Sequence, residues 1–221
     1  MKKIISLTMV CLLALSLSAC TFGQSKDEKV ESKETYRSPE DALNAFVSSV
    51  KNSDMERILE TFTIQNYVEG YDPKDQDAEI IPSSTQDERL VEVYEQLAGF
   101  FLGFGIEINE ADAQALEDII VPEAFDTLEV VRIDLPEKEE QTHKDRISNE
   151  KSAARIHGAQ GWDYRTALIS LEGNTYYCGF EFFIYDGNYE IISLSCPMLQ
   201  LDYRIVTIPC TEDEYLQIIN N

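Results

Sequence analysis

The chain has 221 residues, of which 43% are hydrophobic and 10% aromatic, enough apolar side chain to bury a core and to exclude global disorder. This length fits one moderate domain with accessory segments, or at most two small domains. The 41 acidic and 18 basic residues give a formal charge of −23, which argues against nucleic acid as a partner. With two histidines and no phosphate-binding loop, nucleophile elbow or metalloprotease motif, we expect no metal site, no cofactor and no recognisable catalytic residue.

The N-terminus has the pattern of an export signal. Lys2 and Lys3 precede an apolar run from Ile4 to Leu17, and the chain turns polar after Cys20. A positive start, a short apolar stretch and small residues before the cut are typical of a signal peptide, here residues 1–19, rather than of a membrane-spanning helix.

The segment Leu17-Ser18-Ala19-Cys20 resembles the four-residue box of bacterial lipoprotein signals, whose cysteine becomes the lipidated first residue of the mature chain. The resemblance implies cleavage before Cys20 and a diacylglyceryl thioether on its sulfur. Several acyl chains would anchor the protein stably at the extracytoplasmic side of the cell membrane. The alternatives are a plain signal peptide, or an uncleaved anchor in which Cys20 has no role.

Residues 20–37 form the expected lipidated N-terminus and flexible linker, because Thr21 to Arg37 is rich in Ser, Lys, Glu and Asp. Loss of the two lysines within residues 1–19 takes the formal charge from −23 to −25. Anionic lipid headgroups repel such a surface, so we expect the single α+β domain over residues 38–221 to stand off from the membrane.

Helical patterns fill the first part of this domain. Ser38 before Pro39 predicts the start of a helix that runs to about Lys51, and Asn52-Ser53-Asp54 separates it from a shorter helix ending near Phe62. A loop or an extra turn is expected over 63–83.

Ser84, with Asp87 three residues on, predicts the cap of a third helix that fades at Gly103. A fourth short helix is expected from Asn109 to Ile120.

The spacing of the apolar residues then changes from helical to alternating. Residues 127–135 are expected to form a strand with Val131, Ile133 and Leu135 on one side. Residues 136–160 are expected to form a charged loop with one helical stretch over 148–156. From Gly161 to Pro209 we expect strands at short spacing, the last over Leu199–Ile208.

The turns Glu172-Gly173-Asn174 and Asp186-Gly187-Asn188 offer residues that tolerate positive φ. Three-residue loops at both turns would collect the apolar side chains on one face. This register places Trp162, Tyr164 and Leu168 beside Cys178, Phe180, Phe182 and Ile184, followed by Ile192, Leu194 and Cys196.

Helices followed by a curved antiparallel sheet with one apolar face predict an α+β fold. Two parts of this sequence resemble the nuclear-transport-factor-two-like superfamily. The first is similar to the opening helical hairpin of that superfamily and consists of Ser38-Pro39-Glu40-Asp41-Ala42, Phe46, Lys51-Asn52-Ser53-Asp54 and Ile58. The second is similar to its sheet hairpin and consists of Asp186-Gly187-Asn188-Tyr189-Glu190-Ile191. The resemblance covers most of residues 38–208. It implies helices packed into the concave side of the sheet as a cone, often with a pocket inside. Segment 136–160 and the fourth helix depart from that pattern.

Within the preferred register Cys178 faces Cys196, at a separation that permits a disulfide, and export would favour the bond. The alternative is two small buried side chains that face each other with free thiols. Cys210 would then be unpaired near the C-terminal edge. His143 and His157 are expected on the solvated surface.

Trp162, Tyr164, Phe180 and Phe182 could line a ligand pocket, or could form the core on which the helices pack. The first function hypothesis is a non-enzymatic binding or interaction module, whose partner is a protein or a small molecule. The second is a lyase or isomerase with a carboxylate or histidine inside the cone. A third is a homodimer through an exposed sheet face carrying Phe183, Tyr185, Tyr189 and Ile191.

Overall fold

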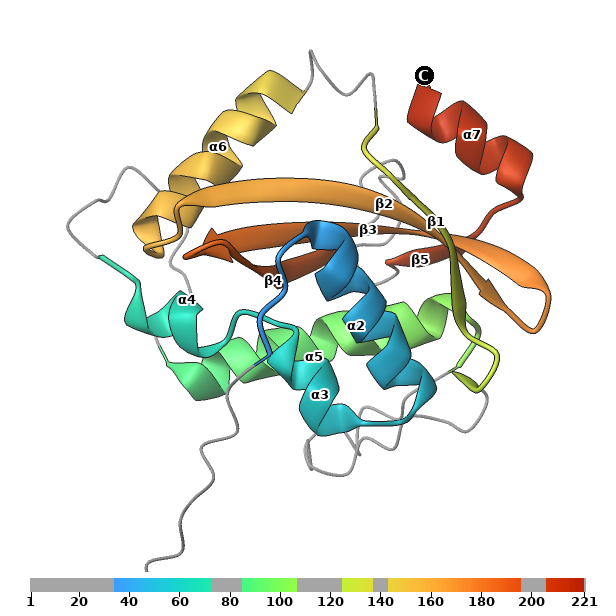
Figure 1. Cartoon of the computed structure of the whole chain (residues 1–221), viewed down its shortest axis with the longest axis horizontal. Coiled ribbons are helices and arrows are strands. Elements are labelled where there is room, and N and C mark those ends of the chain that lie inside the picture. The colour runs from blue at the N-terminus through green and yellow to red at the C-terminus, as the bar shows by residue number, and fades with distance from the viewer. Residues whose placement is uncertain (1–33, 73–84, 107–124, 137–142, 196–205, 221) are drawn as a thin grey trace, which may run out of the picture. The chain divides into compact units, whose positions relative to one another are not determined.

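The structure, a computed structural model, describes residues 34–72, 85–106, 125–136, 143–195 and 206–220. Within these ranges four helices come first and are followed mainly by the strands of an antiparallel sheet, instead of the regular strand–helix alternation of an α/β protein. This arrangement confirms the α+β class (Figure 1). The elements are, in chain order, α2 (Pro39–Lys51), α3 (Met55–Glu60), α4 (Gln65–Glu69), α5 (Gln86–Gly103), β1 (Glu129–Asp134), α6 (His143–Ile156), β2 (Gly161–Leu171), β3 (Asn174–Tyr185), β4 (Asn188–Ser195), β5 (Thr207–Pro209) and α7 (Glu212–Asn220).

The first helices begin where the capping residues predict. The Ser38 hydroxyl accepts a hydrogen bond from the Asp41 amide at 3.0 Å, with Pro39 at the first position of α2. For α5 the cap is Thr85, which accepts from the Glu88 amide at 3.2 Å. The predicted cap Ser84 lies outside the described residues. The sequence offers two equivalent cap-and-acid pairs one residue apart, and the helix uses the second.

The sheet is antiparallel, with the order β1-β2-β3-β4, and β5 pairs with β3 beyond the end of β4. One edge, β4, is partly covered: Phe62 forms a parallel bridge with Ile191, and the Thr63 amide donates to the Ile191 carbonyl at 2.9 Å. β1 is the outermost strand on the opposite side (Figure 1).

The predicted register across the first turn is wrong by one residue. Pairing begins at Leu171 opposite Asn174 and at Tyr185 opposite Asn188, so both hairpins have two-residue turns. Both turn residues have positive φ in each hairpin: 51° and 81° at Glu172-Gly173, and 51° and 75° at Asp186-Gly187. A two-residue turn with positive φ at both positions has the twist that a tight β-hairpin requires. Asn174 and Asn188 are therefore the first residues of the next strands rather than turn residues.

The second hairpin contains a β-bulge that restores the expected pairing further along. Phe182 lies opposite Ile191, whereas Glu181 lies opposite Ser193 and Phe180 opposite Leu194. The extra residue is Ile192, so Ile191 takes the place on the apolar face that we expected Ile192 to hold.

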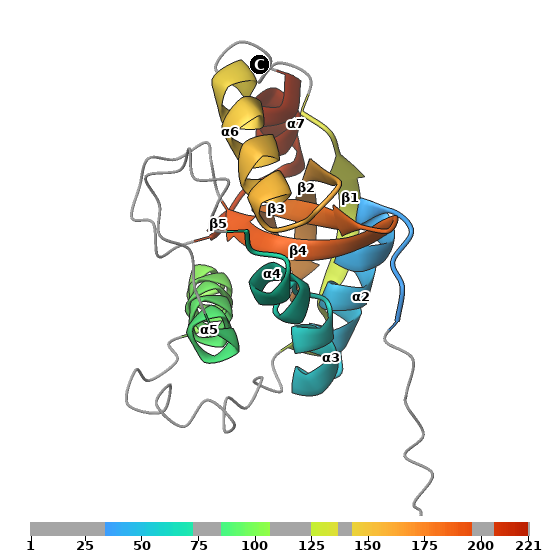
Figure 2. The same cartoon turned by 90° about the vertical axis from the view of Figure 1, so that its left-hand side faces the viewer.

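Helices cover both faces of the sheet (Figure 2). α2 and α5 pack on the inner face, where Phe180, Phe182 and Ile191 join the main core. α6 lies over Phe183 on the outer face, and α7 lies over Leu168 and Tyr177. The expectation of an exposed sheet face is therefore wrong: Phe183 is 1% exposed, and Ile191, buried as well, belongs to the inner face. Helix α7 itself has no counterpart in the sequence prediction.

Two other segments differ from expectation. The bulge in β1 between Val130 and Arg132 leaves Val131 out of the ladder, so Val131, Ile133 and Leu135 do not share a buried side. Tyr36, assigned to the linker, is buried and its carbonyl accepts from the Tyr189 amide at 2.9 Å. The fourth helix and most of the strand over 199–208 lie outside the described residues.

Candidate functional site

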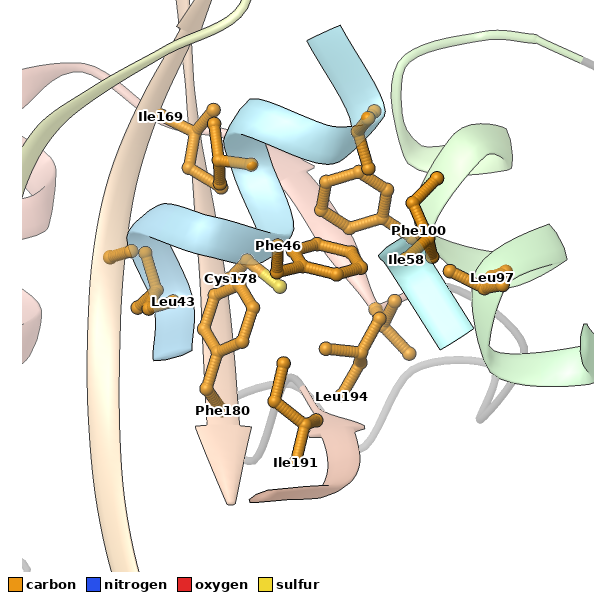
Figure 3. Close-up of a cluster of buried hydrophobic side chains, with 14 of the residues drawn as sticks. Leu43, Phe46, Ile58, Leu97, Phe100, Ile169, Cys178, Phe180, Ile191 and Leu194 are labelled. Atoms are coloured by element: carbon orange, nitrogen blue, oxygen red, sulfur yellow. The ribbon is translucent and has the colours of Figure 1, made fainter. Parts of the chain in front are cut away.

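Aromatic rings of the described residues pack together on the concave side of the sheet (Figure 3). The ring centroid of Phe46 on α2 lies 5.9 Å from Phe62, 5.2 Å from Phe100 and 5.7 Å from Phe180, each in an edge-to-face arrangement. All four side chains are at most 1% exposed. The buried carboxylates of the described chain, Glu181 and Glu190, both belong to the outer face, since they pair with Tyr164 and Phe183.

The four residues expected to share a pocket lie on two faces. Phe180 and Phe182 belong to the main core, whereas Trp162 and Tyr164 stack on the outer face with centroids 6.3 Å apart and planes 6° apart. The one-residue shift at the first turn separates them, because neighbouring strand positions point to opposite faces.

A group of buried and half-buried polar side chains lies where α4 and α5 meet β4; we call it the β4-edge cluster, made of Thr63, Asn66, Tyr67, Arg89, His157, Asn188 and Glu190. Arg89, His157 and Glu190 in this cluster are three of the four buried Arg, His and Glu side chains in the described ranges. The sequence pattern did not bring these three together: it placed His157 on the solvated surface and Glu190 only within the hairpin motif, and it did not indicate Arg89.

Arg89 is 2% exposed and carries a full set of partners. Its guanidinium donates to the Thr63 carbonyl at 3.0 Å, to the Ile192 carbonyl at 2.6 Å and to the Glu92 carboxylate at 2.8 Å. Ile192 is the bulged residue of β4, whose carbonyl has lost its place in the ladder. A buried carbonyl needs a donor, so Arg89 stabilises the bulge.

His157 is buried as well, which corrects the expectation that it is solvated. Its ring stacks on Tyr67 with centroids 3.6 Å apart, and its Nδ1 donates to the Tyr67 carbonyl at 2.7 Å. The Arg89 guanidinium lies 4.6 Å from the centroid of the same tyrosine ring. Burial first, and then the nearby positive charge of Arg89, lower the pKa of His157. His143 belongs to α6, but its side chain lies outside the described part.

Glu190 is fully buried, and its Oε1 accepts from the side-chain amides of Asn66 at 2.8 Å and Asn188 at 3.0 Å. Asn188 in turn accepts from the Tyr36 amide at 2.6 Å. Burial raises the pKa of the neighbouring Tyr185 to about 12. The β4-edge cluster therefore joins the chain around residues 36, 63 and 66 to one strand, and the protein's own side-chain amides bond the Oε1 atom of its carboxylate.

A second polar network lies at the other end of the outer face, under α7. Arg132 donates twice to Asp134, at 2.6 and 2.7 Å, and the Tyr215 hydroxyl donates to the same carboxylate at 3.0 Å. Hydrogen bonding from Arg132 holds the pKa of Asp134 below its usual range. Burial raises the pKa of Tyr215, so its hydroxyl stays protonated and acts as a donor.

A hollow of about 340 Å³ opens beside the first turn, between Asn174, Cys210 and Glu214. Burial raises the pKa of the Cys210 thiol, so the reactive thiolate is disfavoured. Glu214 Oε2 accepts hydrogen bonds from the Thr211 amide at 2.8 Å and from the Thr211 hydroxyl at 2.7 Å. Within the described ranges, no three His, Cys, Asp or Glu side chains are grouped as metal ligands.

The proposed disulfide stays a prediction. Cys178 is buried on the inner face, with Ala167 and Thr207 as its strand partners. Its expected partner Cys196 lies outside the described residues, as does Cys20.

With the geometry in hand, comparison with known proteins supports the fold. A cystatin-like protein from Ruminococcus gnavus aligns with 83% of this chain at a TM-score of 0.52 and 18% identity. This chain shares that fold. It spans 43% of the length of the Ruminococcus protein, and the likeness at this identity concerns architecture alone. No family model and no curated protein matches the sequence. None of the helices in the described segments is long and apolar enough to cross a membrane.

Proposed function

We propose that this protein is a membrane-anchored extracytoplasmic lipoprotein whose domain, of the nuclear-transport-factor-two-like kind, is a non-enzymatic binding or interaction module. The lipid box Leu17-Ser18-Ala19-Cys20, after a positive start and an apolar run, supports the anchor. The flexible linker was expected over residues 20–37, but at its C-terminal end Tyr36 is already packed on β4 and belongs to the domain.

The observation that carries the binding role is the filled interior. A lyase or isomerase of the resembled kind needs a carboxylate or histidine beside a cavity inside the cone. Here that space is occupied by Phe46, Phe100 and Phe180 (Figure 3), and Phe62 packs against Phe46. The buried charges lie elsewhere, and the contacts of Arg89 and Glu190 are to groups of the protein itself. Recognition of a partner then takes place on the outer surface of the domain.

The net charge of the protein restricts the kinds of molecule that it can bind. The formal charge of −25 after removal of residues 1–19 favours neutral or basic proteins and small molecules and disfavours nucleic acids and anionic headgroups. The domain would stand above the lipid on its linker and meet such partners from the extracytoplasmic side.

Labelled palmitate tests the anchor. Cells that produce the full chain should incorporate the label into it, and the chain should sediment with membranes. Cys20→Ala should abolish both, whereas Cys11→Ala, a cysteine inside the same apolar run, should leave both unchanged. Label that persists in the Cys20→Ala chain would overturn the lipoprotein proposal.

A further inference from the structure

The two edges of the sheet differ in what covers them. The edge at β4 is bridged by Phe62 and bonded by Thr63. At β1, Leu135 is 61% exposed and Val131 47% exposed, the two highest values among the large apolar side chains of the described chain. An outermost strand that also displays apolar side chains is suited to pair with another strand.

The sequence of this edge is complementary to itself. If two copies of β1 run antiparallel with Ile133 opposite Ile133, Arg132 of each copy lies opposite Asp134 of the other. Val131, the bulged residue, and Leu135, which follows the last residue of β1, flank this pair and place exposed apolar side chains at both ends of the contact. Opposed charges stabilise antiparallel pairs, and burial of the flanking apolar side chains adds to this stabilisation. A register displaced by one residue loses this match, since Arg132 then meets Ile133 or Leu135.

We propose that β1 is a homodimer interface, through which two copies of this chain pair edge to edge about Ile133. This surface replaces the outer sheet face, which α6 and α7 cover. A two-fold axis through Ile133 makes each contact occur twice, as an isologous interface requires. Arg132 and Asp134 already lie 2.6 Å apart within one copy, so their charges are held in place before the partner arrives.

The geometry also predicts that the dimer is weak. The bulge at Val131 limits the regular ladder to a few residues on each strand, and a contact this small buries less than a standard interface. Two strongly acidic copies repel one another, and salt screens that repulsion over about 8 Å at physiological ionic strength. Association should therefore increase with salt, and anchoring in one membrane would raise the local concentration of copies.

Sedimentation equilibrium of the full chain in density-matched detergent tests the interface. We expect a concentration-dependent dimer that strengthens from low to moderate salt. The double variant Val131→Lys/Leu135→Lys should raise the dissociation constant at least tenfold. Val91→Lys/Leu102→Lys is the matched control, because it changes the charge equally at apolar side chains of α5 that are 43% and 38% exposed; it should dimerise as the wild type does. A wild-type chain that stays monomeric at the highest concentration, or equal losses in the two variants, would overturn the proposal.

Cysteine cross-linking tests the register. Val131→Cys and Leu135→Cys chains with different tags should form a mixed disulfide under mild oxidation, because pairing about Ile133 brings these two positions to the same end of the contact. Two copies of the Val131→Cys chain should cross-link poorly, since four residues at roughly 3.3 Å each separate the sulfurs along the strand. Equal yields of the mixed and the Val131–Val131 products would contradict pairing about Ile133.

Discussion

The two faces of the sheet are both covered by helices, but they are built differently. On the inner face α2 and α5 share one continuous core centred on Phe46 and Phe180. On the outer face α6 and α7 each cover a small cluster of their own, and the buried polar residues Thr166 and Glu181 belong to the strip between them. A continuous apolar core couples its elements into one cooperative unit, whereas separate clusters let elements detach singly.

Phe46→Ala should give the largest effect. Removing a fully buried ring from the inner core should lower the free energy of unfolding by about 3–5 kcal/mol, measured by urea denaturation. Phe183→Ala, which removes an equally buried ring from under α6, is the matched comparison and should cost less, because α6 can detach alone. The cavity left by Phe46→Ala should bind benzene, which the filled wild-type interior should not. Equal losses in the two variants would remove the difference between the faces.

Arg89→Met comes next. It keeps much of the apolar stem of the side chain but leaves the carbonyls of Thr63 and Ile192 without their donor. An unsatisfied buried polar group is costly, so we expect a loss of about 2–3 kcal/mol in the free energy of unfolding. Glu92→Gln, which removes the charge of a half-exposed partner, should change stability far less. A similar loss in both variants would show that the ion pair, rather than the bulge, matters.

Tyr215→Phe should have a smaller effect, limited to the outer face. The change removes one hydroxyl that bonds Asp134 and Thr166, at a cost of about 1 kcal/mol in the free energy of unfolding. Hydrogen exchange of α7 should increase while exchange of α2 stays the same. Faster exchange in both helices would contradict their independence.

The smallest effect is the pH dependence that comes from His157. Its pKa is lower in the folded protein than in the unfolded chain, so the unfolded chain binds the proton more tightly. The stabilisation from the neutral ring is complete above the unfolded pKa, near 6.5, and is lost as the pH falls through the folded pKa. His157→Gln should therefore flatten the change in urea midpoint between pH 7.5 and pH 5. An unchanged slope in this variant would show that other groups carry the acid sensitivity.

Local chemistry accounts for what the sequence predicted correctly. Ser38 and Pro39 determine the start of α2 through contacts within one turn, and the two glycine-containing turns determine that β2, β3 and β4 form hairpins. The α+β class follows from the change in apolar period.

The register errors have a physical cause in both hairpins. Apolar residues occupy both faces of β3, because helices cover both, so the alternation that normally identifies one buried face was absent. The bulge at Ile192 depends on a hydrogen bond from Arg89, which lies about a hundred residues earlier in the chain. The sequence around Ile192 therefore could not predict this hydrogen-bond donor.

The candidate site was missed for the same reason. Arg89, His157 and Glu190 come from α5, the end of α6 and β4, and the fold alone brings them together. In the sequence each resembles a solvated charge among many others.

Native-state hydrogen exchange tests the central claim most directly, that the inner face is one closed core while the outer helices are separate. The amides of α2 and α5 should exchange only through global unfolding, and those of α6 and α7 through smaller and distinct openings. The opening of α6 should become easier at pH 5 as His157 takes up a proton. If α2 instead opened by itself under native conditions, the interior would be accessible, and the account of one closed inner core would be contradicted.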